Sequence, residues 1–112
     1  MSKRSIIQLS EFDITQKIIE SLSNVCTRSV LFSVKNESKD VTQISDELKI
    51  SLSTVYKTLS ILEDLALAEV DRYEISPEGK KIKLYRSRIG KVEITLDNLE
   101  PVLMLYPNDV KN

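Results

Sequence analysis

The stretch VTQISDELKISLSTVYKTLSILEDLALAEV, residues 41–70, constrains the fold most, because it joins two short amphipathic runs through a tight turn. In the first run, Ile44 and Leu48 lie four residues apart and predict a helix that ends near Lys49. In the second run, three apolar residues share one face at helical spacing: Val55, Leu59 and Leu62. Ser51 can cap that helix, which we expect to run to about Asp64. The order helix, short turn, helix indicates a helix-turn-helix unit.

The start of the first of these two helices has two possible caps. Thr42 can cap it with its hydroxyl, and Asp40 with Gln43 forms a competing capping box. Residues 35–40 are polar without periodicity, which predicts a loop before the cap.

The segments before this unit predict two further helices. Residues 1–9 are expected to be a flexible N-terminus. Ser10 can cap a helix to about Leu22, and residues 26–34 predict another, with Val30, Leu31 and Val34 in the core.

The segments after the unit predict strands. Residues 67–75 and 81–89 are rich in β-branched and aromatic residues, and "SPEGK" between them suits a type I turn with Pro77 second and Gly79 fourth. Gly90 interrupts the strand pattern after this hairpin, and residues 92–96 alternate as a further strand.

Residues 102–106 predict either a strand that closes a second hairpin or a helix behind an Asp97–Glu100 capping box. Pro101 would remove a backbone N–H just inside that helix, so it favours the strand. The predicted domain then covers residues 10–96, and residues 97–112 form a C-terminal extension.

The composition excludes several kinds of site. The chain has one cysteine, no histidine and two glycines, so it lacks a disulfide framework, the ordinary zinc ligands and a glycine-rich phosphate loop. We therefore expect no cofactor, no metal and no enzymatic activity. No apolar run approaches the ~20 residues that span a membrane, and the N-terminus lacks a secretory signal, which favours a cytoplasmic protein.

Charge is unevenly distributed along the 112 residues. Residues 72–91 hold seven basic and two acidic side chains, a local charge of +5, whereas residues 35–71 hold four basic and eight acidic ones, a local charge of −4. A basic segment inside a nearly neutral chain is typical of a surface that binds a polyanion, although a solvated basic hairpin would show the same composition.

Together, "VTQISDELKIS", "STVYKTLSILEDLALAEV" and "YEISPEGKKIKLYRSR" resemble the first helix and turn, the recognition helix and the wing of ArsR/MarR-like winged-helix transcription regulators, most closely the small archaeal members. The resemblance covers about residues 19–96. It implies an α+β, mainly helical fold, a winged helix-turn-helix with an added C-terminal strand pair, and double-stranded DNA as the partner. Two positions depart from the family, which often has glycine where this chain has Lys49 and Ala66. The cysteine pairs and histidine clusters of metal-sensing members are absent, and the sequence identifies no small-molecule effector.

The residues expected to contact DNA lie at the starts of the two helices and on the basic hairpin. Short hydroxyls let a helix approach base edges, and lysines and arginines bind phosphate. The candidates are Thr42, Ser51, Ser53, Thr54, Tyr56, Lys57, Lys80, Lys81, Lys83, Arg86 and Arg88. The two arginines have an alternative, which is pairing with Glu69, Asp71 or Glu74 across the hairpin.

Apolar residues outside the helix-turn-helix predict a homodimer, since one winged helix covers only one half-site. The candidate interface residues are Phe12, Ile14, Ile18, Ile19, Val102, Leu103, Met104 and Leu105. The alternative is that both segments close over the chain's own core. A second function also stays open, because a winged helix with an acidic isoelectric point could instead bind a protein of the transcription or chromosome machinery.

Overall fold

The computed structural model of the chain describes residues 14–109, so the predictions for residues 1–9, Ser10 and Phe12 lie outside the described part. An N-terminal helix occupies residues 14–23 and is followed by α2 (Val25–Ser33), α3 (Val41–Leu48) and α4 (Leu52–Asp64). Two antiparallel hairpins come next, β1 (Ala68–Ile75) with β2 (Lys81–Ser87), and β3 (Ile89–Thr95) with β4 (Val102–Pro107). This is the expected α+β winged helix-turn-helix with a C-terminal strand pair.

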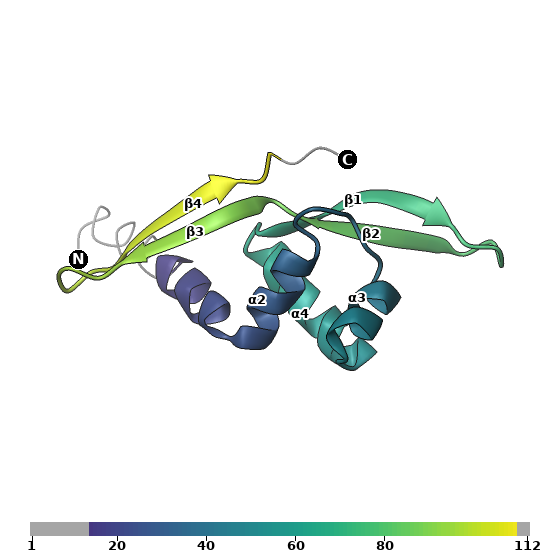
Figure 1. Cartoon of the computed structure of the whole chain (residues 1–112), viewed down its shortest axis with the longest axis horizontal. Coiled ribbons are helices and arrows are strands. Elements are labelled where there is room, and N and C mark those ends of the chain that lie inside the picture. The colour runs from purple at the N-terminus through teal and green to yellow at the C-terminus, as the bar shows by residue number, and fades with distance from the viewer. Residues whose placement is uncertain (1–13, 110–112) are drawn as a thin grey trace, which may run out of the picture.

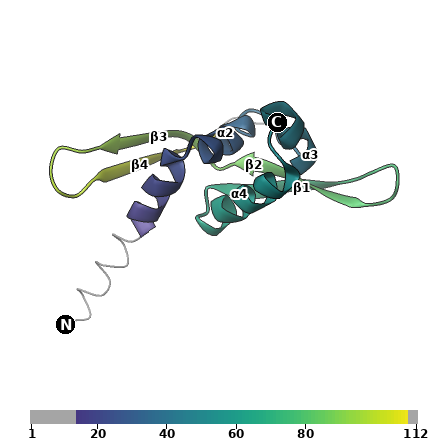
Figure 2. The same ribbon diagram turned by 90° about the horizontal axis from the view of Figure 1, so that it is seen from below.

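The two hairpins extend from the helices in opposite directions (Figures 1 and 2). They give the molecule its elongated shape, with extents of 56 × 28 × 27 Å. We call the β1–β2 hairpin the wing and the β3–β4 hairpin the second hairpin. The helices lie between them, on one side of the long ribbon that β2 and β3 form in succession (Figure 1).

The core forms where the helices meet the bases of the hairpins. Most of the predicted apolar positions of the helices are buried, which confirms the helical periodicity: Val30, Leu31, Val34, Ile44, Val55, Leu59 and Leu62. Leu48 is half-buried and packs against this core. Leu67, just before β1, joins them, as do Ala68, Tyr85 and Ile89 from the strands. Because the helices share one core with the start of β1 and the end of β2, the wing is anchored to the helix-turn-helix.

The N-terminus of α3 carries a capping box. The Asp40 carboxylate accepts from the Gln43 backbone N–H at 2.8 Å, and the Gln43 side chain accepts from the Asp40 N–H at 2.9 Å. The Thr42 cap is therefore wrong, because Asp40 satisfies the free N–H groups reciprocally and leaves Thr42 exposed within the first turn.

The turn between α3 and α4 is held by local hydrogen bonds. The Ser45 hydroxyl donates to the Ile50 carbonyl at 2.6 Å, and Ser51 caps α4 by accepting from the Thr54 N–H at 3.2 Å, as predicted. Lys49 closes α3 in the left-handed conformation, with φ 58°. Ala66, which precedes β1, has φ 59°. These are the two positions at which the sequence departs from the glycines expected from its resemblance to the winged-helix regulators.

The wing turn matches its prediction. The Gly79 N–H donates to the Ser76 carbonyl at 2.9 Å, which closes a four-residue turn, and Gly79 has φ 83°, a conformation that glycine adopts without strain. The strands are slightly shorter than expected, because β1 begins at Ala68 and β2 ends at Ser87.

The second hairpin confirms the strand alternative for residues 102–106. β3 begins earlier than predicted, at Ile89, so Gly90 lies within the strand instead of interrupting it. A Cβ atom at Gly90 would lie 3.2 Å from the Pro107 carbonyl oxygen, so the missing side chain lets the two strands approach. Beyond β4, the Asn108 side chain donates to the carbonyls of Lys35 and Ser87, at 2.8 and 2.9 Å, and ties the end of the hairpin to the loop after α2 and to the end of β2.

Candidate nucleic-acid interface

The outer face of α4 is polar and exposed. Ser53, Tyr56 and Lys57 are exposed, whereas Val55 and Thr58 on the other side of the helix are buried. Tyr56 leaves 57% of its surface in solvent, which is high for an aromatic residue beside a well-packed core. The predicted contact residues of this helix therefore lie on a surface that a ligand can reach.

The hydroxyls at the start of α4 form a small cluster. The Ser51 oxygen lies 2.9 Å from the Thr54 hydroxyl oxygen and 3.2 Å from the Ser53 hydroxyl oxygen. Because Ser51 also caps the helix, this cluster orders the first turn and presents three hydroxyls together at its surface.

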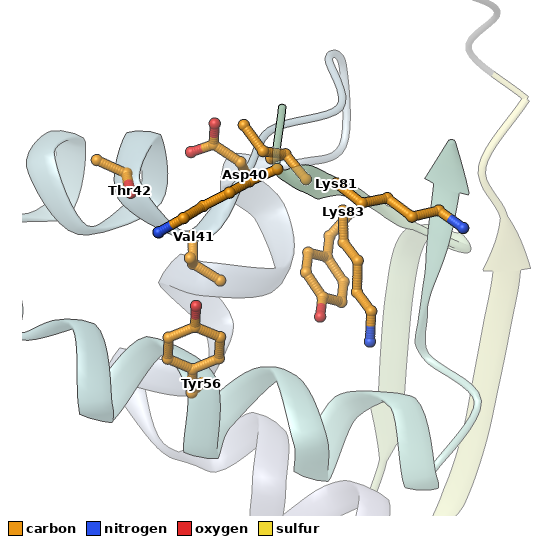
Figure 3. Close-up of a pocket in the computed structure, with 9 residues that line it drawn as sticks. Asp40, Val41, Thr42, Tyr56, Lys81 and Lys83 are labelled. Carbon is orange, nitrogen blue, oxygen red and sulfur yellow. The ribbon is translucent and has the colours of Figure 1, made fainter. Parts of the chain in front are cut away.

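A cleft of about 550 Å³ lies between the start of α3, the middle of α4 and the wing. Five of the predicted contact residues line it: Thr42, Tyr56, Lys80, Lys81 and Lys83. Figure 3 shows the Tyr56 ring pointing from α4 toward Val41 at the start of α3. Residues that are up to 41 positions apart in the sequence are thus brought to one basic, aromatic-lined surface.

The wing lysines reach this cleft in different ways. Lys80 immediately precedes β2, and its backbone N–H donates to the Ser76 hydroxyl at 3.0 Å. Lys81 places its ammonium 4.3 Å from the centroid of the Tyr73 ring, a cation–π contact within the hairpin. Lys83, two residues after Lys81, is exposed on the same face of β2.

The two arginines lie at the base of the wing. Arg88 pairs with Glu69, with 3.8 Å between Nε and Oε2, and its guanidinium lies 3.5 Å from the Ala66 carbonyl. Arg86 is half-buried and stands opposite Glu69 in the strand register. Neither arginine lines the cleft. The ion pair between Arg88 and Glu69 is one of the cross-hairpin pairings that the sequence offered as the alternative.

Tyr85 lines the cleft and was not among the predicted residues. The side-chain alternation of β2 could have identified it, because residues 81, 83 and 85 share one face. Burial raises the pKa of Tyr85 above 10.0, with smaller contributions from Glu63, Tyr56 and Tyr73. The hydroxyl therefore stays protonated at neutral pH and remains available as a donor.

The predicted dimer residues are placed differently from one another. Ile18 is 6% exposed and belongs to the chain's own core, so it is not available for a dimer interface. Ile19 is half-buried. Ile14 is 55% exposed. In β4, Val102 and Met104 lie on one face, and Leu103 and Leu105 lie on the other.

Residues 14–109 contain no group of three or more cysteine, aspartate or glutamate side chains that could hold a metal ion. Within the same range, the helices are all too short or too polar to cross a membrane.

Residues 28–70 match the family model described as "Bacterial regulatory protein, arsR family". The matched range runs from α2 to the first residues of β1 and includes the whole helix-turn-helix. A search of curated proteins found no match. The likeness to archaeal members stays a prediction. The fold and the match together show that this chain carries an ArsR-like winged helix-turn-helix domain, the DNA-binding domain of a transcription regulator.

Proposed function

We propose that the protein is a sequence-specific regulator that acts in the cytoplasm, inserts α4 into the major groove of double-stranded DNA and lays the wing along the phosphate backbone. The observation that carries this proposal is the cleft where Tyr56 of α4 meets Lys80, Lys81 and Lys83 of the wing. A surface with an exposed aromatic ring on a helix and several lysines beside it suits a duplex, which offers base edges in the groove and charge along its rim.

Each part of the surface has its own role in this proposal. Tyr56 and Lys57 reach base edges, because they lie in the N-terminal half of α4 and are exposed. The hydroxyls of Ser51, Ser53 and Thr54 bind phosphate or base edges at the start of that helix. Thr42, at the start of α3, and the three wing lysines bind phosphates on either side of the groove.

The base of the wing contributes through position instead of contact. Arg88 is paired with Glu69, and Arg86 is half-buried, so we assign both to holding the wing against the end of α4. The phosphate contacts then come from the exposed lysines near the wing turn.

We further propose that the protein works as a homodimer on two half-sites. The exposed apolar residues of the second hairpin and Ile14 of the N-terminal helix lie outside the helix-turn-helix, so a partner there leaves α4 and the wing free. One winged helix covers a single half-site, and a dimer doubles the contacted surface.

The test uses duplexes selected from a random pool by the wild-type protein. Tyr56→Ala and Lys57→Ala are expected to weaken binding to the selected duplex roughly 5- to 150-fold, the cost of losing a base contact, and to change binding to scrambled duplex much less. Ser60→Ala, exposed in the C-terminal half of the same helix, is the matched control and should leave both affinities unchanged. Equal losses on selected and scrambled duplexes would reduce the two residues to backbone contacts and contradict the proposal.

A further inference from the structure

The outer edges of the two hairpins differ in a way that the DNA-binding role does not explain. β1, at the edge of the wing, carries four charged residues, Glu69, Asp71, Arg72 and Glu74. Charged side chains are a usual protection of an edge strand against pairing with another chain. β4 has the sequence VLMLYP and carries no charge, and within the described residues it pairs with β3 alone.

β4 is also apolar on both of its faces. Val102 and Met104 are 50% and 49% exposed on one face, and Leu105 is 36% exposed on the other. A two-stranded hairpin is marginally stable by itself, and an exposed apolar edge strand favours the addition of another strand. Within the two strands of the hairpin, the charged residues lie on β3 and are already paired: Glu93 accepts from the Tyr106 hydroxyl, and Lys91 lies 3.9 Å from Glu93.

We infer that β4 pairs with β4 of a second copy of this chain, antiparallel, about a two-fold axis through Met104. The product is a four-stranded sheet in which the two β4 strands lie at the centre. This inference deepens the proposed homodimer by assigning its interface to one strand edge.

The side-chain alternation of β4 is compatible with this register. A two-fold axis perpendicular to a sheet keeps each residue on its own face, so residues that pair must lie on the same face. With Met104 at the axis, Leu103 pairs with Leu105 of the partner subunit, and Val102 pairs with Tyr106 of the partner subunit. Both pairings satisfy the rule, and because β4 has no charge, like charges are not brought together.

The position of β4 keeps this interface away from the wing. The hairpins lie at opposite ends of a body 56 Å long (Figure 2). A second copy paired along β4 therefore leaves both wings accessible.

The same symmetry places both helical bodies on one side of the sheet. Val92 and Leu103 share a face of the second hairpin and pack against the core, so the helices lie on that face. Since the two-fold axis keeps each face in place, the helices of both copies lie on the same side. The wings then extend to the two outer ends of the dimer.

A disulfide trap tests the interface without DNA, so its result is independent of the proposed DNA binding. In a Cys26→Ser background, Met104→Cys should form a covalent dimer under oxidising conditions, because paired residues at a two-fold axis are within disulfide reach. Thr95→Cys is the matched control, since Thr95 lies on the same face but on β3, which becomes an outer strand of the proposed sheet. Covalent dimer from Met104→Cys alone supports the inference. Equal yields from both variants, or none from Met104→Cys, would overturn it.

Sedimentation at micromolar concentration gives an independent measurement. Wild-type protein should sediment as a dimer. Met104→Lys, which places two ammonium groups opposite each other, should sediment as a monomer, and its circular dichroism spectrum should show that it is folded. Thr95→Lys should remain dimeric. A wild-type monomer, or a dimer that persists in Met104→Lys, would contradict the β4 interface. Scrambled-duplex binding by monomeric Met104→Lys shows separately whether the DNA-binding proposal holds.

Discussion

Lys39 and Tyr85 exchange two backbone hydrogen bonds, in which the Lys39 N–H donates to the Tyr85 carbonyl at 3.1 Å and the Tyr85 N–H donates to the Lys39 carbonyl at 2.8 Å. Lys39 immediately precedes the cap of α3, and Tyr85 lies two residues beyond Lys83 on the wing strand. This bridge therefore fixes the start of α3 against the wing and sets the width of the cleft between them.

Lys39→Pro should open this bridge. Proline removes the N–H and leaves the buried Tyr85 carbonyl without its donor, which we expect to cost about 1–3 kcal/mol of unfolding free energy and to weaken DNA binding. Urea unfolding and a gel-shift titration measure the two effects. Lys39→Ala is the control, because it keeps both backbone bonds and loses only the ion pair to Glu47, a partly exposed interaction expected to contribute about 1 kcal/mol or less. Equal destabilisation by both variants would assign the effect to the side chain.

Lys49→Gly and Ala66→Gly should each stabilise the protein. Both residues have positive φ, 58° and 59°, a conformation in which a Cβ atom costs roughly 1–2 kcal/mol. Part of that gain is offset by the greater freedom of glycine in the unfolded chain, so we expect a net increase of about 0.5–1 kcal/mol. Ser60→Gly, within α4, is the opposite control and should destabilise by roughly 0.5 kcal/mol. Thermal unfolding distinguishes the signs, and a loss of stability at residues 49 and 66 would show that no strain resides there.

The stability of the protein should fall above about pH 10 because of Tyr85. Its pKa is raised in the folded state by burial, so the unfolded state loses the proton first as pH rises. Below the unfolded value of 10.0 both states are protonated and stability does not depend on this group; above it, stability decreases until the folded pKa is passed. Tyr85→Phe should flatten the dependence of the urea midpoint between pH 9 and pH 11.

The measurement is made in a Tyr106→Phe background. The hydrogen bond to Glu93 raises the pKa of Tyr106 as well, and its removal leaves Tyr85 as the group under test. An alkaline decrease as steep in the Tyr85→Phe variant as in its parent would show that Tyr85 is not the cause.

Local sequence patterns predicted the elements whose causes are local. The helical spacing of Val55, Leu59 and Leu62 and the hydroxyl of Ser51 act within a few residues, and the structure confirms both. The Thr42 cap was wrong because two adjacent residues competed for the same N–H groups, and the capping box of Asp40 satisfies two donors at once.

Relationships between distant segments were not predictable in the same way. Gly90 resembled a strand interruption because the position of Pro107 across the hairpin cannot be read from the residues around Gly90. The bridge from Lys39 to Tyr85 uses backbone atoms alone and leaves no residue-type signature. The cleft depends on that bridge, so the sequence identified five of its lining residues without showing that they meet.

The most direct test of DNA binding by the wing is the salt dependence of affinity for a duplex. Affinity should fall steeply as salt rises, and replacing both Lys80 and Lys81 by alanine should lower the slope of log affinity against log salt by roughly 0.9 for each lost phosphate contact, close to 2 in all. The control replaces Lys35 and Lys91, which removes the same charge outside the cleft and should leave the slope nearly unchanged. A smaller slope in the Lys80/Lys81 variant alone, with its sequence preference retained, is the predicted result; an unchanged slope in that variant would contradict the wing as the phosphate contact.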